Sequence, residues 1–353
     1  MKCKLDQEIY FNWRRLDGYP QPFKFAGGPR EPGKTTASWA GKIWPRYLKY
    51  RMPWIYLVRQ SVEITEALIE SLRGNITKFY DDVPEFQYNK GSFKEGIVDI
   101  KVNGDIFIRI VSLSLPLRRI KLAVLQNLDG VFADEYIIDP RSGEKYQPNE
   151  GFKIKEAYTT WRREANGVLK MYFSANFYSL YNPLFVELGV DVSKLRKGEV
   201  WTNELIAVEW VVLTPQLRAK LLAENPLYQF DEDYNNYALE GQAINDQNIK
   251  LGELPQNFSL RFIFKAQNKF IGVFKANEYS ENGDKFFCKF IKDFSKYRTI
   301  YCYEFEELIE RAVVMSLDER IKLQKFKEAF RQREIAFEDV NCYYFCEEIY
   351  KNI

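Results

Sequence analysis

The chain has 353 residues, enough for two domains, and its 46% hydrophobic and 28% charged residues are typical of a soluble globular protein without a membrane span. It contains no histidine, which excludes Ser-His and Cys-His catalysis and leaves acid and base chemistry to carboxylates. The formal net charge is +2, so a nucleic acid would have to meet local basic patches, and the five cysteines are expected to be reduced thiols.

The first predicted element is a short strand followed by a phosphate-binding loop. Gly28, Gly33, Lys34 and Thr35 complete the pattern G-x-x-x-x-G-K-[ST], and Thr36 follows directly. Glycines let backbone N–H groups curve around phosphates, the lysine reaches the β and γ oxygens, and the threonine hydroxyl ligates Mg²⁺. The pattern therefore predicts ATP and Mg²⁺ as ligands.

Short apolar runs and helical stretches alternate after this loop, which predicts an α/β domain with a mostly parallel sheet. The Asn-Gly pair at 103–104 lies within an alternating segment and predicts a hairpin inserted into this order. The expected elements are a helix from Lys34 to about Tyr50, a strand at Trp54–Arg59, a helix at Val62–Leu72, the hairpin at Asp99–Ile108 and a strand at Leu169–Ser174.

Two adjacent carboxylates, Asp134 and Glu135, end another expected apolar strand in the segment Gly130–Glu135. This order fits a Walker B motif, in which Asp134 holds Mg²⁺ through its water shell and Glu135 polarises the attacking water. A small-molecule kinase does not need such a glutamate, so the pair favours a hydrolysing motor. The alternative is a strand end with two solvated acids.

The strand expected after Walker B closes with a polar residue, Asn176. We expect this side chain to sense the γ-phosphate, although an asparagine ending a strand in a turn is the alternative. The strand is preceded by a predicted helix that carries Trp161, Arg162 and Arg163.

Taken together, these motifs resemble those of the DNA-packaging ATPases of small podophages with terminal-protein-linked genomes (Salasviridae-like), relatives of the large terminases. The matching segments are Gly28–Thr35, Ile55–Arg59, Val131–Tyr136, Pro148–Glu150, Trp161–Arg163, Phe173–Asn176 and Asn182–Pro183. The resemblance implies a P-loop domain of the ASCE/RecA-like type in a motor that pushes double-stranded DNA into a procapsid. It also implies a ring, usually a homopentamer, on the portal or connector, working in the host cytoplasm. Whether a packaging RNA takes part is left open.

The resemblance further implies an arginine that acts in trans on the ATP of the next subunit. Either Arg162 or Arg163 matches this position, and the local spacing does not choose between them. Arg30, inside the phosphate loop, is a rival, and a solvated helix end is the alternative for all three. An arginine supplied to the γ-phosphate is worth about 10³ to 10⁵ in rate in other nucleotide hydrolases.

We expect an ATPase domain at residues 1–190, a hinge region at 191–220 and a second domain at 221–353. The resemblance implies that this second domain is a vestigial α+β RNase H-like domain. Its predicted hairpin at 260–274 contains no Asp or Glu, so we expect no nuclease activity. Candidate contacts to DNA phosphates lie in two basic groups, Lys265, Lys269 and Lys275 and Arg118, Arg119 and Lys121.

The hypothesis from sequence is an ATP-driven translocase for double-stranded DNA. A P-loop helicase or recombinase-like DNA-dependent ATPase remains an alternative, and so does a small-molecule phosphotransferase. Alternation of the second domain's lysines with phenylalanines is also typical of an ordinary half-buried sheet, without any nucleic-acid function.

Overall fold

The structure is a computed structural model that describes residues 3–6, 8–139, 142, 144–165, 167–180, 182–226, 228, 239, 249–266, 269–277, 284–292, 299–302 and 312–352. The chain divides into two compact units. The first comprises Met1–Ser179, Glu187–Val190 and Lys194–Ile244, and the second comprises Leu180–Val186, Asp191–Ser193 and Asn245–Ile353. The first unit therefore extends further along the chain than the expected domain of residues 1–190.

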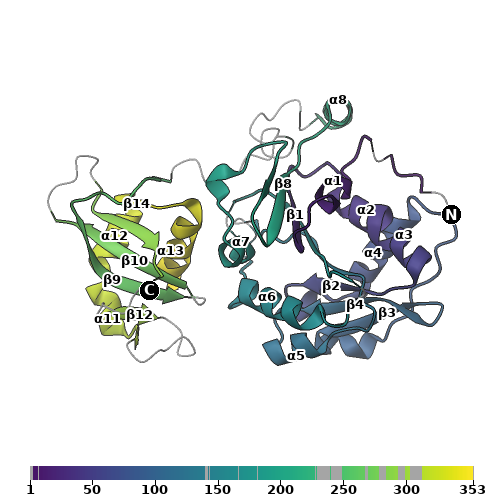
Figure 1. The fold of residues 1–353 in the computed structure, drawn as a ribbon, viewed down its shortest axis with the longest axis horizontal. Coiled ribbons are helices and arrows are strands. Elements are labelled where there is room, and N and C mark those ends of the chain that lie inside the picture. The colour runs from purple at the N-terminus through teal and green to yellow at the C-terminus, as the bar shows by residue number, and fades with distance from the viewer. Residues whose placement is uncertain are drawn as a thin grey trace. The chain divides into compact units, whose positions relative to one another are not determined.

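The first unit is built on a mostly parallel sheet (Figure 1). In spatial order, the strands that the structure describes are β3 (Ile97–Val102), β4 (Asp105–Ser112), β2 (Trp54–Val58), β5 (Gly130–Ala133), β6 (Met171–Asn176), β1 (Phe23–Gly28), β8 (Ile206–Trp210) and β7 (Val200–Thr202). Only the edge pairs β3–β4 and β7–β8 are antiparallel. The α/β fold and the hairpin after residue 97 are thus as predicted.

Strands β1, β5 and β6 all end at the same edge of the sheet, because they run parallel. Their register places Gly28 beside Asn176 and Ala133 beside Phe173. Ligands of open parallel sheets bind beyond the carboxyl ends of the strands. The phosphate loop, the acidic pair and Asn176 are therefore brought to one edge, which we call the carboxyl edge.

Helices cover the sheet on both faces, so β1 and β2 are buried along their whole length. On one face, Tyr158 of the helix after residue 149 packs against Phe23 with ring centroids 5.0 Å apart. The helical segments described up to residue 225 include α1 (Arg14–Asp17), α2 (Lys34–Ser38), a π-helical turn (Trp39–Ile43), α3 (Trp44–Tyr50), α4 (Glu66–Thr77), α5 (Leu117–Leu122), α6 (Glu150–Trp161), α7 (Pro183–Leu188) and α8 (Pro215–Glu224).

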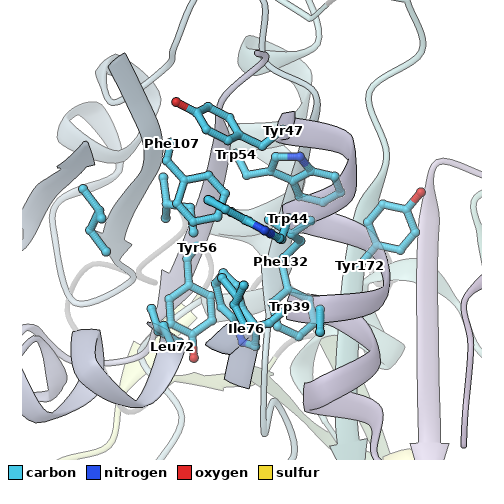
Figure 2. Packing of buried hydrophobic residues seen from close by; sticks show 14 of the residues in the cluster. Trp39, Trp44, Tyr47, Trp54, Tyr56, Leu72, Ile76, Phe107, Phe132 and Tyr172 are labelled. Carbon is cyan, nitrogen blue, oxygen red and sulfur yellow. The ribbon is translucent and has the colours of Figure 1, made fainter. Parts of the chain in front are cut away.

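Aromatic side chains fix the helix after the phosphate loop to the other face of the sheet (Figure 2). Trp39 lies edge-on to Tyr56 and Phe132, with ring centroids 5.2 and 5.6 Å away. The π turn lies just before Pro45, which has no N–H to continue four-residue hydrogen bonding; Trp44 N–H instead donates to Trp39 O, five residues back. The first turns of this helix are thereby packed against the sheet next to the phosphate loop.

Two predicted helices differ from those observed. The helix expected at Val62–Leu72 begins at Glu66, because the Thr65 hydroxyl accepts the Leu68 N–H at 3.1 Å and caps its start. The helix expected to carry both arginines ends at Trp161, so Arg162 and Arg163 follow α6.

The second unit contains a mixed sheet packed against helices. Its described strands, in spatial order, are β13 (Ala312–Val314), β12 (Ile300–Cys302), β9 (Phe258–Ala266), β10 (Lys269–Ala276), β11 (Phe286–Phe290) and β14 (Ile335–Phe337), and its described helices include α11 (Leu317–Lys322), α12 (Gln324–Arg331) and α13 (Val340–Asn352). The predicted antiparallel arrangement of β9, β10 and β11 is confirmed. Phe326 of α12 packs on Phe262 and Phe264, with ring centroids 6.0 and 5.4 Å away. None of the described helices has the length and apolar character needed to cross a bilayer.

Candidate nucleotide-binding site

Two glycines shape the loop between β1 and α2. Gly28 ends β1 with a φ of 148°, and a Cβ on this residue would lie 2.5 Å from the carbonyl oxygen of Val211. Gly33 stands directly before α2 with a φ of 78°, in the left-handed region that favours glycine. The backbone itself therefore requires glycine at both positions that the sequence pattern marks.

Lys34 begins α2 and is buried, with 5% of its surface exposed. Its Nζ donates to the carbonyl oxygen of Pro29 and, at 3.2 Å, to Oδ1 of Asn176. Desolvation lowers the pKa of Lys34 to about 7, although the charges of Asp134, Glu135 and Glu31 act in the opposite direction. An anion near this ammonium group would favour its charged form.

The acidic pair follows β5 directly. Asp134 accepts a hydrogen bond from Ser174 Oγ on β6, which orients its carboxylate. Glu135 is exposed and has a left-handed backbone, with φ of 47°, and its N–H donates to Asp134 Oδ1 at 3.0 Å. Desolvation at the cavity wall, followed by the charge of Asp134, raises the pKa of the Glu135 carboxyl, whereas Arg30 lowers it.

These side chains line a cavity of about 450 Å³ at the carboxyl edge, within the size range of small-molecule sites. The residues around it are Arg30, Glu31, Gly33, Lys34, Thr35, Thr36, Asp134, Glu135, Ala175, Asn176, Asn225 and Tyr228. Residues of the phosphate-loop pattern and of the acidic pair, separated by about a hundred positions in sequence, therefore line the same cavity.

The donor set at this cavity suits a nucleotide with Mg²⁺. Thr35 and Asp134 both offer oxygen atoms to the cavity, and Lys34 brings a cation beside them. Within the described residues, no cluster of three or more Cys, Asp or Glu side chains could hold a metal by itself. A magnesium ion bound here would thus rely on these two residues, phosphate oxygens and water, which is its usual mode of binding.

Sequence reasoning missed four residues of the cavity wall, Glu31, Ala175, Asn225 and Tyr228. Tyr228 Oη donates to Glu31 Oε1 at 2.7 Å, and Asn225 lies nearby on the same wall. Both Asn225 and Tyr228 follow α8, in the segment that was expected to start the second domain. No local pattern could have found them, because strand β8 first has to pair with β1 to bring α8 to this edge.

The candidate arginines lie at opposite edges of the sheet. Arg30 lines the cavity. Arg162 and Arg163 are exposed just before Glu164, whose carbonyl accepts the Leu128 N–H ahead of β5. They are therefore at the amino edge, where the parallel strands begin, and a six-residue strand separates the two edges by roughly 17 Å.

The basic residues predicted to contact DNA differ in their exposure. Arg118 and Arg119 on α5 are exposed, whereas Lys121 is half-buried and its Nζ lies 2.6 Å from Glu156 Oε2. In the second unit, Lys275 is exposed and Lys269 is half-buried. Lys265 is buried, with 8% of its surface exposed, which counts against a direct phosphate contact.

Structural comparison links this arrangement to known proteins. A chain of the bacteriophage Phi-29 viral genome packaging motor assembly superposes with a TM-score of 0.64 at 18% identity, covering 98% of this chain and 99% of that one. A chain of the Phi-28 gp11 DNA packaging motor superposes with a TM-score of 0.61 at 17% identity, covering 98% of both chains. This chain has the fold of the phage DNA-packaging motors.

The packaging-motor fold thus extends over nearly the whole chain. No protein-family model matches the sequence, and no curated protein matches it. At such low identity the comparison establishes the fold alone.

Proposed function

We propose that this protein is an ATPase that drives double-stranded DNA into a procapsid. The observation that carries the proposal is the meeting of Lys34, Asp134, Glu135 and Asn176 around one cavity in a packaging-motor fold. Glu135 adds a water-activating carboxylate to a phosphate-binding loop, which is the composition of a hydrolase site rather than of a site that only binds nucleotide.

Each side chain has a distinct task in hydrolysis. Lys34 and the backbone of the loop bind the phosphates, and Thr35 and Asp134 would hold a magnesium ion, which would neutralise charge on the phosphate oxygens. Glu135 accepts a proton from the attacking water at its carboxylate, and the pKa of this carboxyl, raised by desolvation, makes it a stronger base. Asn176, which accepts a hydrogen bond from Lys34, is placed to contact the γ-phosphate, so its hydrogen bonds at the end of β6 would differ between ATP and ADP.

The arginine that completes the site comes from a neighbouring subunit. Arg162 and Arg163 are at the far edge of the sheet from the cavity of their own chain, and they are exposed. An arginine at that edge can reach the ATP of a neighbouring subunit more readily than the ATP bound by its own chain. Hydrolysis then takes place only after subunits have assembled, which couples ATP turnover to formation of the ring on the portal.

DNA is gripped through its phosphates, without sequence preference. Arg118, Arg119 and Lys275 are the exposed candidates for this grip, and Lys121 and Lys269 are half-buried candidates. No DNA cleavage is proposed, since β9 and β10 carry no carboxylate.

An ATPase assay with double-stranded DNA, single-stranded DNA or a small phosphate acceptor tests the proposal against its alternatives. The assembled protein should hydrolyse ATP faster with double-stranded DNA, and it should fill procapsids with that DNA. Stimulation by single strands together with strand separation would instead identify a helicase or recombinase-like enzyme. Phosphate transfer to a small acceptor without DNA would identify a phosphotransferase.

Mixing two inactive variants tests the arginine in trans. The double variant Arg162→Ala, Arg163→Ala should lack hydrolysis because it cannot complete a neighbour's site, and Glu135→Gln should lack the base. Mixed assemblies should recover some hydrolysis, measured as phosphate release, since one chain lends the arginine and the other the intact acid. Mixed assemblies that form and bind ATP but show no recovery would favour Arg30 acting within its own subunit.

A further inference from the structure

Arg59 is a largely buried arginine just after β2 that does not line the nucleotide cavity. Its side chain is 11% exposed, and its guanidinium lies over the rings of Tyr136 and Tyr146, with Cζ 5.7 and 5.1 Å from the ring centroids. Nε is 3.2 Å from Glu150 Oε2, and Nη2 donates to the carbonyl oxygen of Tyr136 at 2.6 Å. One side chain thus joins the ends of two strands and the start of α6.

The partner of Arg59 on α6 is itself buried. Glu150 is 0% exposed and is the first residue of α6, where the helix dipole favours a negative charge. Its Oε2 also accepts the Gln147 N–H at 2.7 Å. A carboxylate buried in this way needs a cation, and Arg59 supplies it.

The partner of Arg59 on the other side is the backbone immediately after Glu135. The left-handed conformation of Glu135 is unfavourable for a residue with a Cβ, so neighbouring contacts must hold it. The N–H of Tyr136 donates to Ser174 O at 3.0 Å, and its carbonyl accepts the hydrogen bond from Arg59. The peptide groups on either side of Tyr136 are therefore fixed to β6 and to Arg59.

We propose that Arg59 is a positioning residue for hydrolysis. It links the Tyr136 carbonyl to Glu150 at the start of α6 and so keeps the neighbouring Glu135 carboxylate at its place in the cavity. The inference rests on the proposed ATPase function. It assigns Arg59 no contact with ATP, because its contacts are with Glu150, Tyr136 and Tyr146.

The substitution Arg59→Lys separates positioning from charge. Lysine keeps the positive charge but lacks the planar fork, so one ammonium group cannot reproduce the bonds to both Glu150 and the Tyr136 carbonyl. Displacement of a catalytic group by about 1 Å can cost about 100-fold in rate. We expect kcat to fall by about 10-fold to 100-fold while the Kd for an ATP analogue changes less than about 3-fold, since the phosphate loop is untouched.

Arg109 provides a matched control on the same sheet. It is 19% exposed, bonds both oxygens of Asp99 at 2.6 and 2.8 Å, and donates to the carbonyls of Ala123 and Val124. Arg109→Lys removes the same kind of fork from a carboxylate and backbone carbonyls, away from Glu135. It should lower thermal stability to a similar degree and leave kcat within about 2-fold.

Hydrogen exchange gives a readout that does not depend on activity. The backbone amides of residues 134–138, measured without nucleotide, should exchange faster in Arg59→Lys than in the parent protein or in Arg109→Lys. Equal exchange in all three proteins, or a kcat in Arg59→Lys equal to that of Arg109→Lys, would overturn the proposal. A parallel loss of Kd and kcat would overturn it as well, because Arg59 would then support binding.

A second variant covers the case in which Arg59→Lys does not fold. Glu150→Gln keeps the shape of the partner and removes the charge that orients Arg59, so it should lower kcat at unchanged Kd; an unchanged kcat would reject the proposal. The two proposals fail separately. A parent protein that binds ATP but does not hydrolyse it on DNA contradicts the ATPase assignment, whereas the exchange measurement still decides whether Arg59 holds residues 134–138.

Discussion

The two edges of the first sheet both contain a buried lysine, but the lysines have different surroundings. Lys34 at the carboxyl edge is 5% exposed and Lys24 at the amino edge is 0% exposed. Burial lowers the pKa of Lys34 to about 7 and that of Lys24 to about 8, with desolvation as the largest cause in each case. Burial of charge is thus common to both edges and does not by itself mark a functional site.

The partners of these charges are what differ. At the amino edge, Lys24 Nζ donates to Tyr19 O at 2.5 Å, and the nearby ions are paired, Lys42 with Asp17 at 2.6 Å. At the carboxyl edge, no salt bridge within 4.0 Å joins Lys34 to Asp134 or Glu135 in the described part of the chain, and all three face a cavity. Charged side chains that face a cavity without a direct salt bridge between them are typical of a binding site for a charged ligand.

Replacing each lysine gives the largest expected contrast. Lys34→Ala should abolish measurable nucleotide binding, because the ammonium group that meets the phosphates is gone. Lys24→Met retains the apolar stem in a buried site, so it should keep the parent Kd. Titration with a fluorescent ATP analogue, with thermal unfolding as the folding control, measures both. Equal loss of binding in the two variants would remove the distinction between the edges.

The acids give the next largest contrast. Glu135→Gln should keep ATP affinity within about 3-fold and lower kcat by about 10² to 10⁴, the usual contribution of a general base. Asp129 at the amino edge accepts bonds from Arg46 and Trp54 Nε1, so Asp129→Asn should lower the melting temperature but leave kcat per folded molecule unchanged. Single-turnover phosphate release distinguishes the two effects. A fall in kcat for Asp129→Asn as large as for Glu135→Gln would contradict the assignment.

The smallest contrast concerns pH. Binding of phosphates raises the pKa of Lys34, so above about pH 7 the nucleotide should bind with proton uptake and Kd should rise by up to about tenfold per pH unit. Lys24 affects folding instead. Its folded pKa of about 8 lies below the ordinary lysine value of 10.5, so the unfolded chain binds more protons between these values and the free energy of unfolding should rise with pH there. Calorimetry in buffers of different ionisation enthalpy tests the first effect, and denaturant unfolding of Lys24→Met, which should lose the rise, tests the second.

The sequence predicted the parts of the site that depend on local spacing and strand order. Gly33 and Lys34 close the loop that follows β1, Asp134 directly follows β5 and Asn176 ends β6. Because these strands run parallel, topology alone brings the four residues together. Tyr228 could not be predicted, because its approach to Glu31 depends on the non-local pairing of β8 with β1. The burial of Lys265 was missed for a related reason, since alternation along one strand does not tell what covers either face.

The location of Arg162 and Arg163 gives the proposed assembly a polarity. A subunit that offers its arginines at the amino edge and receives a neighbour's at the carboxyl edge makes head-to-tail contacts, in which two different surfaces meet. Such contacts continue from copy to copy until the rotation at each step closes the circle, and otherwise they grow into a filament. The number of subunits is then set by an angle at the contact surface, and a substitution there could change it without altering any residue of the nucleotide cavity.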